Sequence, residues 1–278
     1  MKVASCQFGV GGDVRANCAR ICEFMRKAKD GHADIVHFSE CALSGYAGTD
    51  FETFEGFNWQ LLHAETQKVM ALAAELKIWV VLGSSHRLTE PNKPHNSLYL
   101  ISPDGKIVDR YDKRFGTPID LGNYTSGNRF VNFELKGVRC SLLICFDLRF
   151  PEIYRELYKQ GVQCIFQSFY NARRQGPSIH SDIMRQTMQC RAATNYMWIS
   201  MTNSSAWYSP YPSCFIRPDG KIVEQLGRNK EGMMINTVDL SKKLYDPMAD
   251  FRQTAIDGSL TNAGGEIDDP RSKDTTNL

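Results

Sequence analysis

Mostly apolar runs alternate with amphipathic segments along the first third of the chain. The runs have the length of strands and lie at residues 3–8, 33–38 and 78–83. Between them, apolar side chains recur at helical spacing over residues 14–25 and 59–77. Nearly continuous apolar strands have both faces buried, and the helices between them cover the sheet. The pattern therefore predicts a layered α/β fold, in which Asp13 caps the first helix.

The rest of the chain contains further strand-like runs and two hairpin turns. The hexapeptide PDGKIV occurs at residues 103–108 and again at 218–223, each time between strand-like runs. Pro-Asp-Gly favours a tight turn because proline restricts φ and glycine supplies a positive φ. The repeat indicates that each half of the chain contributes a similar pair of strands. Further strands are expected at residues 130–135, 138–144, 164–167, 197–201 and 233–238, and helices at 151–160 and 181–195.

The C-terminal end differs in composition from the rest of the chain. From residue 258 onward the sequence is polar and has no apolar periodicity. No comparable break divides the first 250 residues. We therefore expect one domain over residues 1–257 and a polar tail over residues 258–278, which is either mobile or docked on a partner surface.

Charge and hydropathy exclude several classes of protein. The 278 residues include 33 Lys and Arg against 31 Asp and Glu, a formal net charge of +2. This balance provides no basic field for nucleic acid or an anionic membrane. No apolar run reaches the ~20 residues of a membrane-spanning helix, and the first run is too short for a signal peptide. A cytoplasmic protein with a small-molecule partner is expected, without nucleic-acid or membrane partners.

The nine cysteines show no spacing typical of a zinc site or a disulfide framework. Their number is odd and no CxxC pair occurs. Most are therefore expected to be buried, reduced thiols. No metal and no organic cofactor is implied, and a thiol-redox function lacks a resolving cysteine.

Three reactive side chains each follow the end of a strand-like run: Glu40, Lys113 and Cys145. Ligand sites in layered α/β folds gather at such strand ends. Together these groups would provide a thiolate nucleophile, a carboxylate that takes its proton and an ammonium that stabilises an oxyanion, with the N–H of Phe146 as a second donor. A turn cap, a surface charge and a packed thiol are the structural alternatives. A cysteine–histidine pair is also possible, although no histidine has a spacing that singles it out.

Sequence blocks around these three residues resemble the nitrilase superfamily of carbon–nitrogen hydrolases. The blocks are FSECALSGY, RYDKRF and CFDLRFPE, and the likeness extends to VASCQF and MQCRAATNYMWIS. The resemblance implies a four-layer αββα sandwich and a homodimer or higher homo-oligomer. It also implies that Glu40 is the general base, Lys113 the oxyanion stabiliser and Cys145 the nucleophile in a hydrolase that forms a thioester and releases ammonia.

Two positions depart from the family's pattern. Many members carry a second Glu before an aromatic-x-x-Gly element, and here that position is Asp120. Its side chain is shorter by one methylene, so Asp120 is expected only as an accessory residue. The family's helix often reads Arg-Ala-x-Glu-Asn, but this chain has Thr194 in place of the carboxylate.

The residues after Cys145 favour a small amide that bears a carboxylate. CFDLRFPE is more similar to the Nit-type ω-amidases than to true nitrilases. Arg149 is suited to bind a substrate carboxylate through its planar fork, although an ion pair with Glu152 would explain it equally well. Asn171 and Arg173, in the loop FYNARRQG, are further substrate-binding candidates.

The sequence favours one function and leaves others open. The favoured function is hydrolysis of an ω-amide or a carbamoyl acid. The alternatives are an N-carbamoyl-amino-acid hydrolase or nitrilase of the same family, and a non-catalytic scaffold with this fold. If a dimer packs through the helix after Cys145, the interface is expected to contain Phe150, Ile153, Tyr154 and Leu157.

Overall fold

The structure is a computed structural model that describes all residues except 172–174, 263, 266 and 278. It consists of two compact units, Met1–Leu244 and Tyr245–Leu278. The first unit contains both β-sheets and every described residue that sequence analysis proposes for the site. The domain boundary expected at residue 257 stays a prediction.

The first sheet is built from both ends of the unit Met1–Leu244. Its strands and the helices between them are β1 (Lys2–Gln7), α1 (Val14–Asp30), β2 (Ile35–His37), α2 (Trp59–Leu76), β3 (Trp79–His86), β4 (His95–Ile101), β5 (Ile107–Asp112) and β12 (Gly232–Thr237). The strand order is β12-β1-β2-β3-β4-β5. β1, β2 and β3 are parallel, and the other pairs are antiparallel. Parallel neighbours need crossover connections, which α1 and α2 supply.

The second sheet repeats this plan with the second half of the chain. Its elements are α3 (Pro118–Asn123), β6 (Asn132–Leu135), β7 (Val138–Ile144), the 3₁₀ helix η1 (Cys145–Arg149), α4 (Pro151–Lys159), β8 (Cys164–Ser168), α5 (Ile179–Asn195), β9 (Trp198–Thr202), β10 (Cys214–Ile216) and β11 (Ile222–Gln225). The strand order is β11-β10-β9-β8-β7-β6. β7, β8 and β9 are parallel, with α4 and α5 as crossovers.

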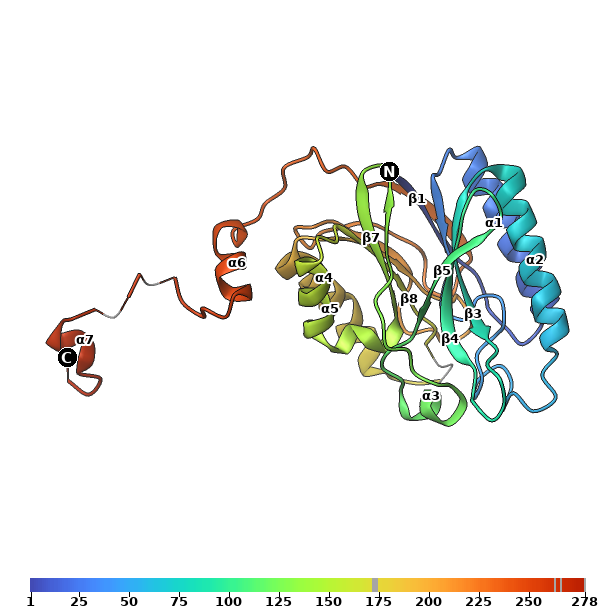
Figure 1. The fold of residues 1–278 in the computed structure, drawn as a ribbon, viewed down its shortest axis with the longest axis horizontal. Helices are drawn as coiled ribbons and strands as arrows, with labels where there is room; N and C mark the ends of the chain where they lie inside the picture. The colour runs from blue at the N-terminus through green and yellow to red at the C-terminus, as the bar shows by residue number, and fades with distance from the viewer. Residues whose placement is uncertain (172–174, 263, 266, 278) are drawn as a thin grey trace. The chain divides into compact units, whose positions relative to one another are not determined.

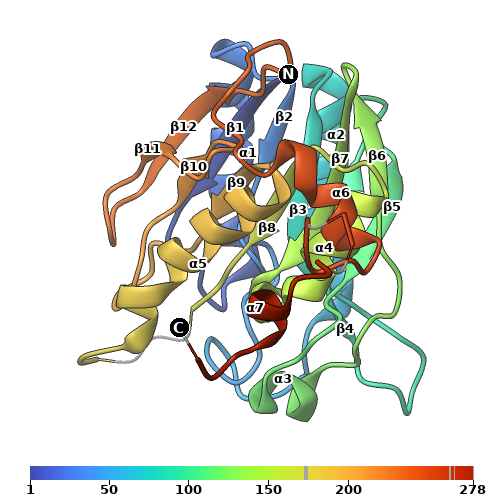
Figure 2. The ribbon, with the colours of Figure 1, turned by 90° about the vertical axis from the view of Figure 1, so that its left-hand side faces the viewer.

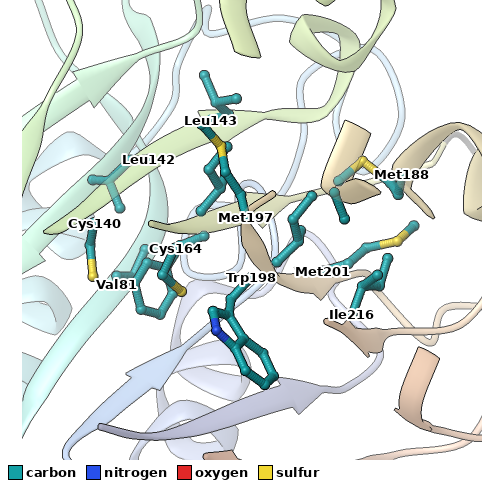
Figure 3. Packing of buried hydrophobic residues seen from close by; sticks show 14 of the residues in the cluster. Val81, Cys140, Leu142, Leu143, Cys164, Met188, Met197, Trp198, Met201 and Ile216 are labelled. Carbon is teal, nitrogen blue, oxygen red and sulfur yellow. The ribbon is translucent and has the colours of Figure 1, made fainter. Parts of the chain in front are cut away.

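The elements of Met1–Leu244 form four layers. Figure 1 shows α1 and α2 on the outer side of the first sheet, and Figure 2 shows α4 and α5 over the second. One buried apolar cluster includes Val81 of β3, Cys164 of β8 and Met188 of α5, so it is continuous across the second sheet (Figure 3). Each large apolar side chain buried there contributes about 1.5–3 kcal/mol. The predicted αββα sandwich is confirmed.

Both PDGKIV segments form the predicted hairpin turns, the first between β4 and β5 and the second between β10 and β11. Gly105 and Gly220 have φ values of +71° and +81°. A Cβ at Gly105 would lie 2.6 Å from the carbonyl oxygen of Met70 in α2, and a Cβ at Gly220 would lie 3.1 Å from that of Gln189 in α5. Each turn thus packs closely against the helix of its own half, which favours glycine at both positions.

The short helices differ from the sequence expectations. α3 and η1 contain too few residues to show an apolar period, so the pattern did not predict them. The unit Tyr245–Leu278 contains α6 (Ala249–Ile256) and α7 (Pro270–Lys273), and α7 lies in the polar segment that has no apolar periodicity. Asp269 caps α7 and Pro270 begins it. No helix of the described residues has both the length and the apolar character needed to cross a membrane. The cytoplasmic location stays a prediction.

The expected interface residues of α4 lie mostly inside the chain. Ile153, Tyr154 and Leu157 are 5%, 0% and 0% exposed because this face of α4 packs on the second sheet. The hydroxyl of Tyr154 donates a hydrogen bond to Oε1 of Gln167 at 2.7 Å. The expectation that these three side chains contact a partner chain is therefore wrong. The homodimer itself stays a prediction.

A buried polar chain connects the two sheets near their centre. His37 of β2 is fully buried, and its Nδ1 and Nε2 each lie 2.8 Å from a serine hydroxyl, those of Ser200 and Ser168. Burial lowers the pKa of His37 to about 3, so the ring is neutral. The Ser168 hydroxyl also donates to the carbonyl of Phe38 at 2.9 Å. These bonds hold the end of β2, three residues before Glu40, against β8 and β9.

Candidate active site

The three predicted catalytic side chains lie at the ends of three strands. Glu40 follows β2 and Lys113 follows β5, both in the first sheet, whereas Cys145 directly follows β7 in the second. Glu40 and Lys113 are 0% and 3% exposed. The carboxylate of Glu40 is hydrogen-bonded to Lys113 and also interacts with the thiol of Cys145. The fold thus brings these residues together at one end of the sandwich.

Three hydrogen-bond donors surround the carboxylate of Glu40. Its Oε1 accepts from Nζ of Lys113 at 2.8 Å and from Nδ2 of Asn96 at 2.7 Å. Its Oε2 accepts from the backbone N–H of Tyr170 at 2.8 Å. Burial raises the pKa of Glu40 above its ordinary value, and the positive charge of Lys113 opposes this rise. The result is a fixed carboxylate that takes up a proton more readily than an exposed glutamate.

Lys113 lies between two carboxylates. Its Nζ is 2.8 Å from Oε1 of Glu40 and 2.9 Å from Oδ2 of Asp120. Burial alone would lower the pKa of Lys113, but the nearby negative charges, Glu40 first, outweigh it and raise this pKa well above its ordinary value. Lys113 therefore remains a cation at neutral pH.

α3 brings Asp120 to Lys113 despite its short side chain. Thr117 caps α3, and its backbone N–H donates to Oδ2 of Asp120 at 2.7 Å. The hydroxyl of Tyr46 donates to the other oxygen, Oδ1. Burial tends to raise the pKa of Asp120, but Lys113 and these hydrogen bonds lower it below its ordinary value. Asp120 is thus a second fixed anion beside the ammonium.

Cys145 has a backbone conformation that side chains other than glycine rarely adopt. Its φ is +38°, in a region that is costly for residues with a Cβ. The buried carboxylate of Asp147 holds the turn, because it accepts from the N–H groups of Ile144 and Phe115 at 3.0 Å each and from the hydroxyl of Tyr111 at 2.7 Å. Asp147, two residues after Cys145, therefore holds the backbone of the candidate nucleophile in this unfavourable conformation.

The thiol of Cys145 is protonated in the resting site. Burial raises its pKa well above the ordinary value, and the negative charge of Glu40 raises it further. Lys113 opposes both effects but does not outweigh them. A thiol in this state can act as a nucleophile only if a nearby base takes its proton.

A cleft of about 640 Å³ opens onto Cys145. The accessory candidate Phe146 and the substrate-binding candidates Arg149 and Asn171 line it. Arg149 Nη2 lies 3.4 Å from Nδ1 of His180, which also lines the cleft. Among the described residues Arg149 forms no ion pair with Glu152, the structural alternative for its role. The candidate Arg173 lies outside the described residues.

Other sulfur and acidic groups form no metal site. Within the part of the chain that the structure describes, no group of three or more His, Cys, Asp or Glu side chains is arranged to hold a metal ion. All nine cysteines are free thiols. The Sγ atoms of Cys18 and Cys22 lie 3.9 Å apart on α1, beyond the length of a disulfide bond.

Sequence reasoning missed several groups that hold the site. Tyr46 and Asp147 lie within the blocks FSECALSGY and CFDLRFPE, so the blocks pointed to them without indicating what they contact. Asn96 is the second residue of β4 and lies in no local motif. It reaches the site because β4 pairs with β5, where its carbonyl accepts the N–H of Lys113 at 2.8 Å. Only the pairing of the two strands could have predicted this contact.

The sequence profile described as carbon-nitrogen hydrolase matches residues 2–243. The chain belongs to the carbon–nitrogen hydrolase family. The match covers both halves of the sandwich and all three strand ends described above, so the resemblance seen in the sequence blocks is confirmed.

This carbon–nitrogen hydrolase is similar to several proteins over nearly its whole length. It is 25% identical over 273 residues to the omega-amidase NIT2 of Homo sapiens, which covers 92% of this chain and 95% of the relative. It is also 25% identical over 272 residues to an (R)-stereoselective amidase of Pseudomonas sp., with 94% of each chain covered. The crystal structure of an amidase from Nesterenkonia sp. has the same fold, with a TM-score of 0.74 at 19% identity over 84% of this chain and 89% of that chain.

Proposed function

We propose that this carbon–nitrogen hydrolase releases ammonia from a small amide through a thioester on Cys145. The observation that carries the proposal is the buried cluster in which Glu40 is hydrogen-bonded to the ammonium of Lys113 and lies near enough to Cys145 to raise the pKa of its thiol. Related proteins support the reaction class: an amidase from Nesterenkonia sp. AN1 has been solved in complex with butyramide, and with acrylamide added at its active site cysteine.

The first half-reaction forms the thioester. Glu40 accepts the thiol proton as the sulfur of Cys145 attacks the amide carbon. Negative charge develops on the carbonyl oxygen, where the ammonium of Lys113 and the backbone N–H of Phe146 stabilise it. Glu40 then returns the proton to the amide nitrogen, the C–N bond breaks, and ammonia leaves.

The second half-reaction restores the thiol. Glu40 takes a proton from a water molecule, whose oxygen attacks the thioester carbon. The C–S bond breaks, the carboxylic acid leaves, and the sulfur of Cys145 recovers the proton. Asp120 acts as an accessory group that holds Lys113 cationic, since its carboxylate lies 2.9 Å from Nζ.

A carboxylate on the substrate is the proposed basis of selectivity. Arg149 is the candidate that binds it, because the guanidinium lines the cleft four residues after Cys145. Its neighbour His180 is neutral, since burial and the charge of Arg149 lower the pKa of His180. No Asp or Glu is among the described residues that line the cleft, so the positive charge of Arg149 favours an anionic group there. Asn171 and Arg173 are proposed to assist, and the first of these lines the cleft.

Replacing Arg149 by Met is expected to raise KM for succinamate about tenfold or more and to leave KM for butyramide nearly unchanged. A charge-assisted hydrogen bond contributes about 1.5–3 kcal/mol to binding. Only succinamate has a carboxylate that can form this bond with Arg149, so only its binding is weakened. Steady-state ammonia release with both substrates measures the difference. An equal loss for both amides would show that Arg149 is structural, and Arg139→Met on β7 provides a matched control.

The reaction class is tested by a screen for ammonia release. The panel contains ω-amides with a carboxylate, neutral amides, N-carbamoyl amino acids and nitriles, and mass spectrometry searches for an acyl group on Cys145. Peptide mapping is needed because Cys190 is exposed and Cys22 is half-buried, so both can react adventitiously. Ammonia from carbamoyl acids or nitriles alone would favour those alternatives, and none from any compound would favour the scaffold.

Replacing Asp120 by Asn is expected to move the acidic limb of the pH–rate profile to lower pH. The negative charge of Asp120 raises the pKa of Glu40, and Glu40 works as a base only when ionised. Removing that charge lowers the pKa of Glu40, so Glu40 ionises at lower pH. The loss of one contact to Lys113 also lowers the plateau of kcat/KM about tenfold. The profile of kcat/KM measures both effects. Asp219→Asn, in the second hairpin, should change neither, and an unchanged or upward-shifted limb for Asp120→Asn contradicts the argument.

A further inference from the structure

A second cavity, of about 630 Å³, lies between α2 and the outer face of β3, β4 and β5, and it shares no lining residue with the cleft at Cys145. Figure 1 shows α2 lying along this sheet. Both the helix and the strands supply side chains, among them Trp59, Gln67 and Met70 from α2 and His86, Tyr99 and Arg110 from the sheet.

A chain of hydrogen bonds along the sheet leaves one donor without an acceptor. Nη1 of Arg110 can only donate, so Nε2 of His86, 2.5 Å away, accepts. Burial, aided by the charge of Arg110, lowers the pKa of His86 to about 4, so the ring carries one proton, on Nδ1. That proton is donated to the hydroxyl oxygen of Tyr99 at 2.9 Å. The hydroxyl group of Tyr99 therefore accepts a hydrogen bond but donates none, because no acceptor for its proton is found among the described residues.

Arg110 provides further donors at the same place. Its Nε and Nη2 donate to the carboxylate of Asp112 at 2.8 and 3.0 Å, and Nη1 donates to His86. These bonds use three of the five guanidinium N–H groups, so two remain. The side chain is 28% exposed, which leaves these groups accessible from the cavity it lines. The cavity therefore holds three unused donors on two neighbouring strands.

The rest of the lining is apolar, neutral polar or basic. Trp59, Met70 and Ile107 supply the apolar part, and no Asp or Glu is among the lining residues, all of which the structure describes. Arg87 adds a second guanidinium, which lies 5.8 Å from the centre of the Trp59 ring and 3.9 Å from the carboxylate of Glu90. Because unused hydrogen-bond donors favour an anion, while the indole favours a flat apolar body, the lining matches one class of ligand.

We propose that this cavity binds a small carboxylate that has a planar apolar body. The carboxylate accepts hydrogen bonds from the hydroxyl of Tyr99 and the free N–H groups of Arg110. The apolar body packs against Trp59 and Met70. The site is independent of the proposed catalytic function, because neither Cys145 nor any other residue of the cleft contributes to it.

Isothermal titration of the full-length protein with 2-naphthoate tests this proposal. Wild-type protein is expected to bind 2-naphthoate at one saturable site, and 2-naphthalenemethanol, which has no charge, at least tenfold more weakly. Tyr99→Phe removes one donor and is expected to weaken 2-naphthoate binding about tenfold. Gln67→Glu places a carboxylate in the lining at an exposed helix position and is expected to weaken binding by a similar factor.

Arg149→Met separates this site from the cleft. Binding of 2-naphthoate that persists in Arg149→Met and weakens in both Tyr99→Phe and Gln67→Glu supports the proposal. Binding that Arg149→Met abolishes would place the ligand in the cleft and overturn it. The absence of saturable binding to wild-type protein, or equal affinity in wild type and Gln67→Glu, would also overturn it. Gln67→Glu keeps the test decisive if Tyr99→Phe does not fold.

Discussion

Cys145→Ala is expected to lower ammonia release from an amide on the order of 10⁶-fold, to the rate without enzyme. The methyl group cannot form a thioester, and Glu40 and Lys113 alone do not provide a second nucleophile of comparable reactivity. The fold should persist, because the thiol makes none of the contacts that hold the turn: Asp147 holds it through the backbone of Ile144. Ammonia assays and thermal unfolding of the same preparation measure the two effects separately.

The matched control for this variant is Cys190→Ala. Cys190 is an exposed thiol on α5, so its removal should leave both the rate and the melting temperature unchanged. Substantial ammonia release by Cys145→Ala, or an acyl group that still attaches to the protein on a different cysteine, would refute the assignment of Cys145 as the nucleophile.

Glu40→Gln is expected to lower kcat about 10³-fold and to reduce the free energy of unfolding by about 3 kcal/mol. The lost rate reflects the missing base in both half-reactions. The lost stability has a separate cause: Asn96, Lys113 and Tyr170 all donate to the carboxylate. A glutamine must point its NH₂ group at one of these donors, whichever way the amide is turned. In this variant the ammonium of Lys113 also retains only one buried anionic partner, Asp120.

Glu65→Gln is the appropriate comparison. Glu65 is also buried, with 3% exposure, but it lies on α2 and pairs with Lys68. Its variant should retain full activity, which would show that the loss in Glu40→Gln does not follow from any buried glutamate. A Glu40→Gln enzyme with a normal rate would exclude Glu40 as the proton acceptor. A variant with normal stability would contradict the argument that the glutamine NH₂ group faces another hydrogen-bond donor.

The sequence predicted the layers of the fold because they follow from local patterns. Apolar runs, the cap at Asp13 and the two Pro-Asp-Gly turns each depend on residues that are close together in the chain. α3 was missed because a six-residue helix has no visible period. The wrong placement of Leu157 has a different origin: an apolar face of a helix shows that it is buried, but not whether its own sheet or another chain buries it.

Only those site residues that lie at strand ends or within the sequence blocks could be predicted. Glu40, Lys113 and Cys145 each follow a strand, so the rule that ligand sites lie at strand ends selected them together. Asn96 lies at the beginning of a strand and reaches Glu40 only through the pairing of β4 with β5. Asp147 accepts one local hydrogen bond, from Ile144, and two from the distant residues Tyr111 and Phe115, which no local spacing could indicate.

The origin of the site's groups in two different sheets sets a condition on activity. The base and the cation follow strands of the first sheet, while the nucleophile and the N–H of Tyr170 follow strands of the second. A slip of one sheet against the other by a single residue, about 3.3 Å, would separate sulfur from carboxylate while both sheets stayed intact. The catalytic rate therefore depends on how the two sheets are aligned. The hydrogen bonds of His37 in β2 to Ser168 in β8 and Ser200 in β9 keep them aligned.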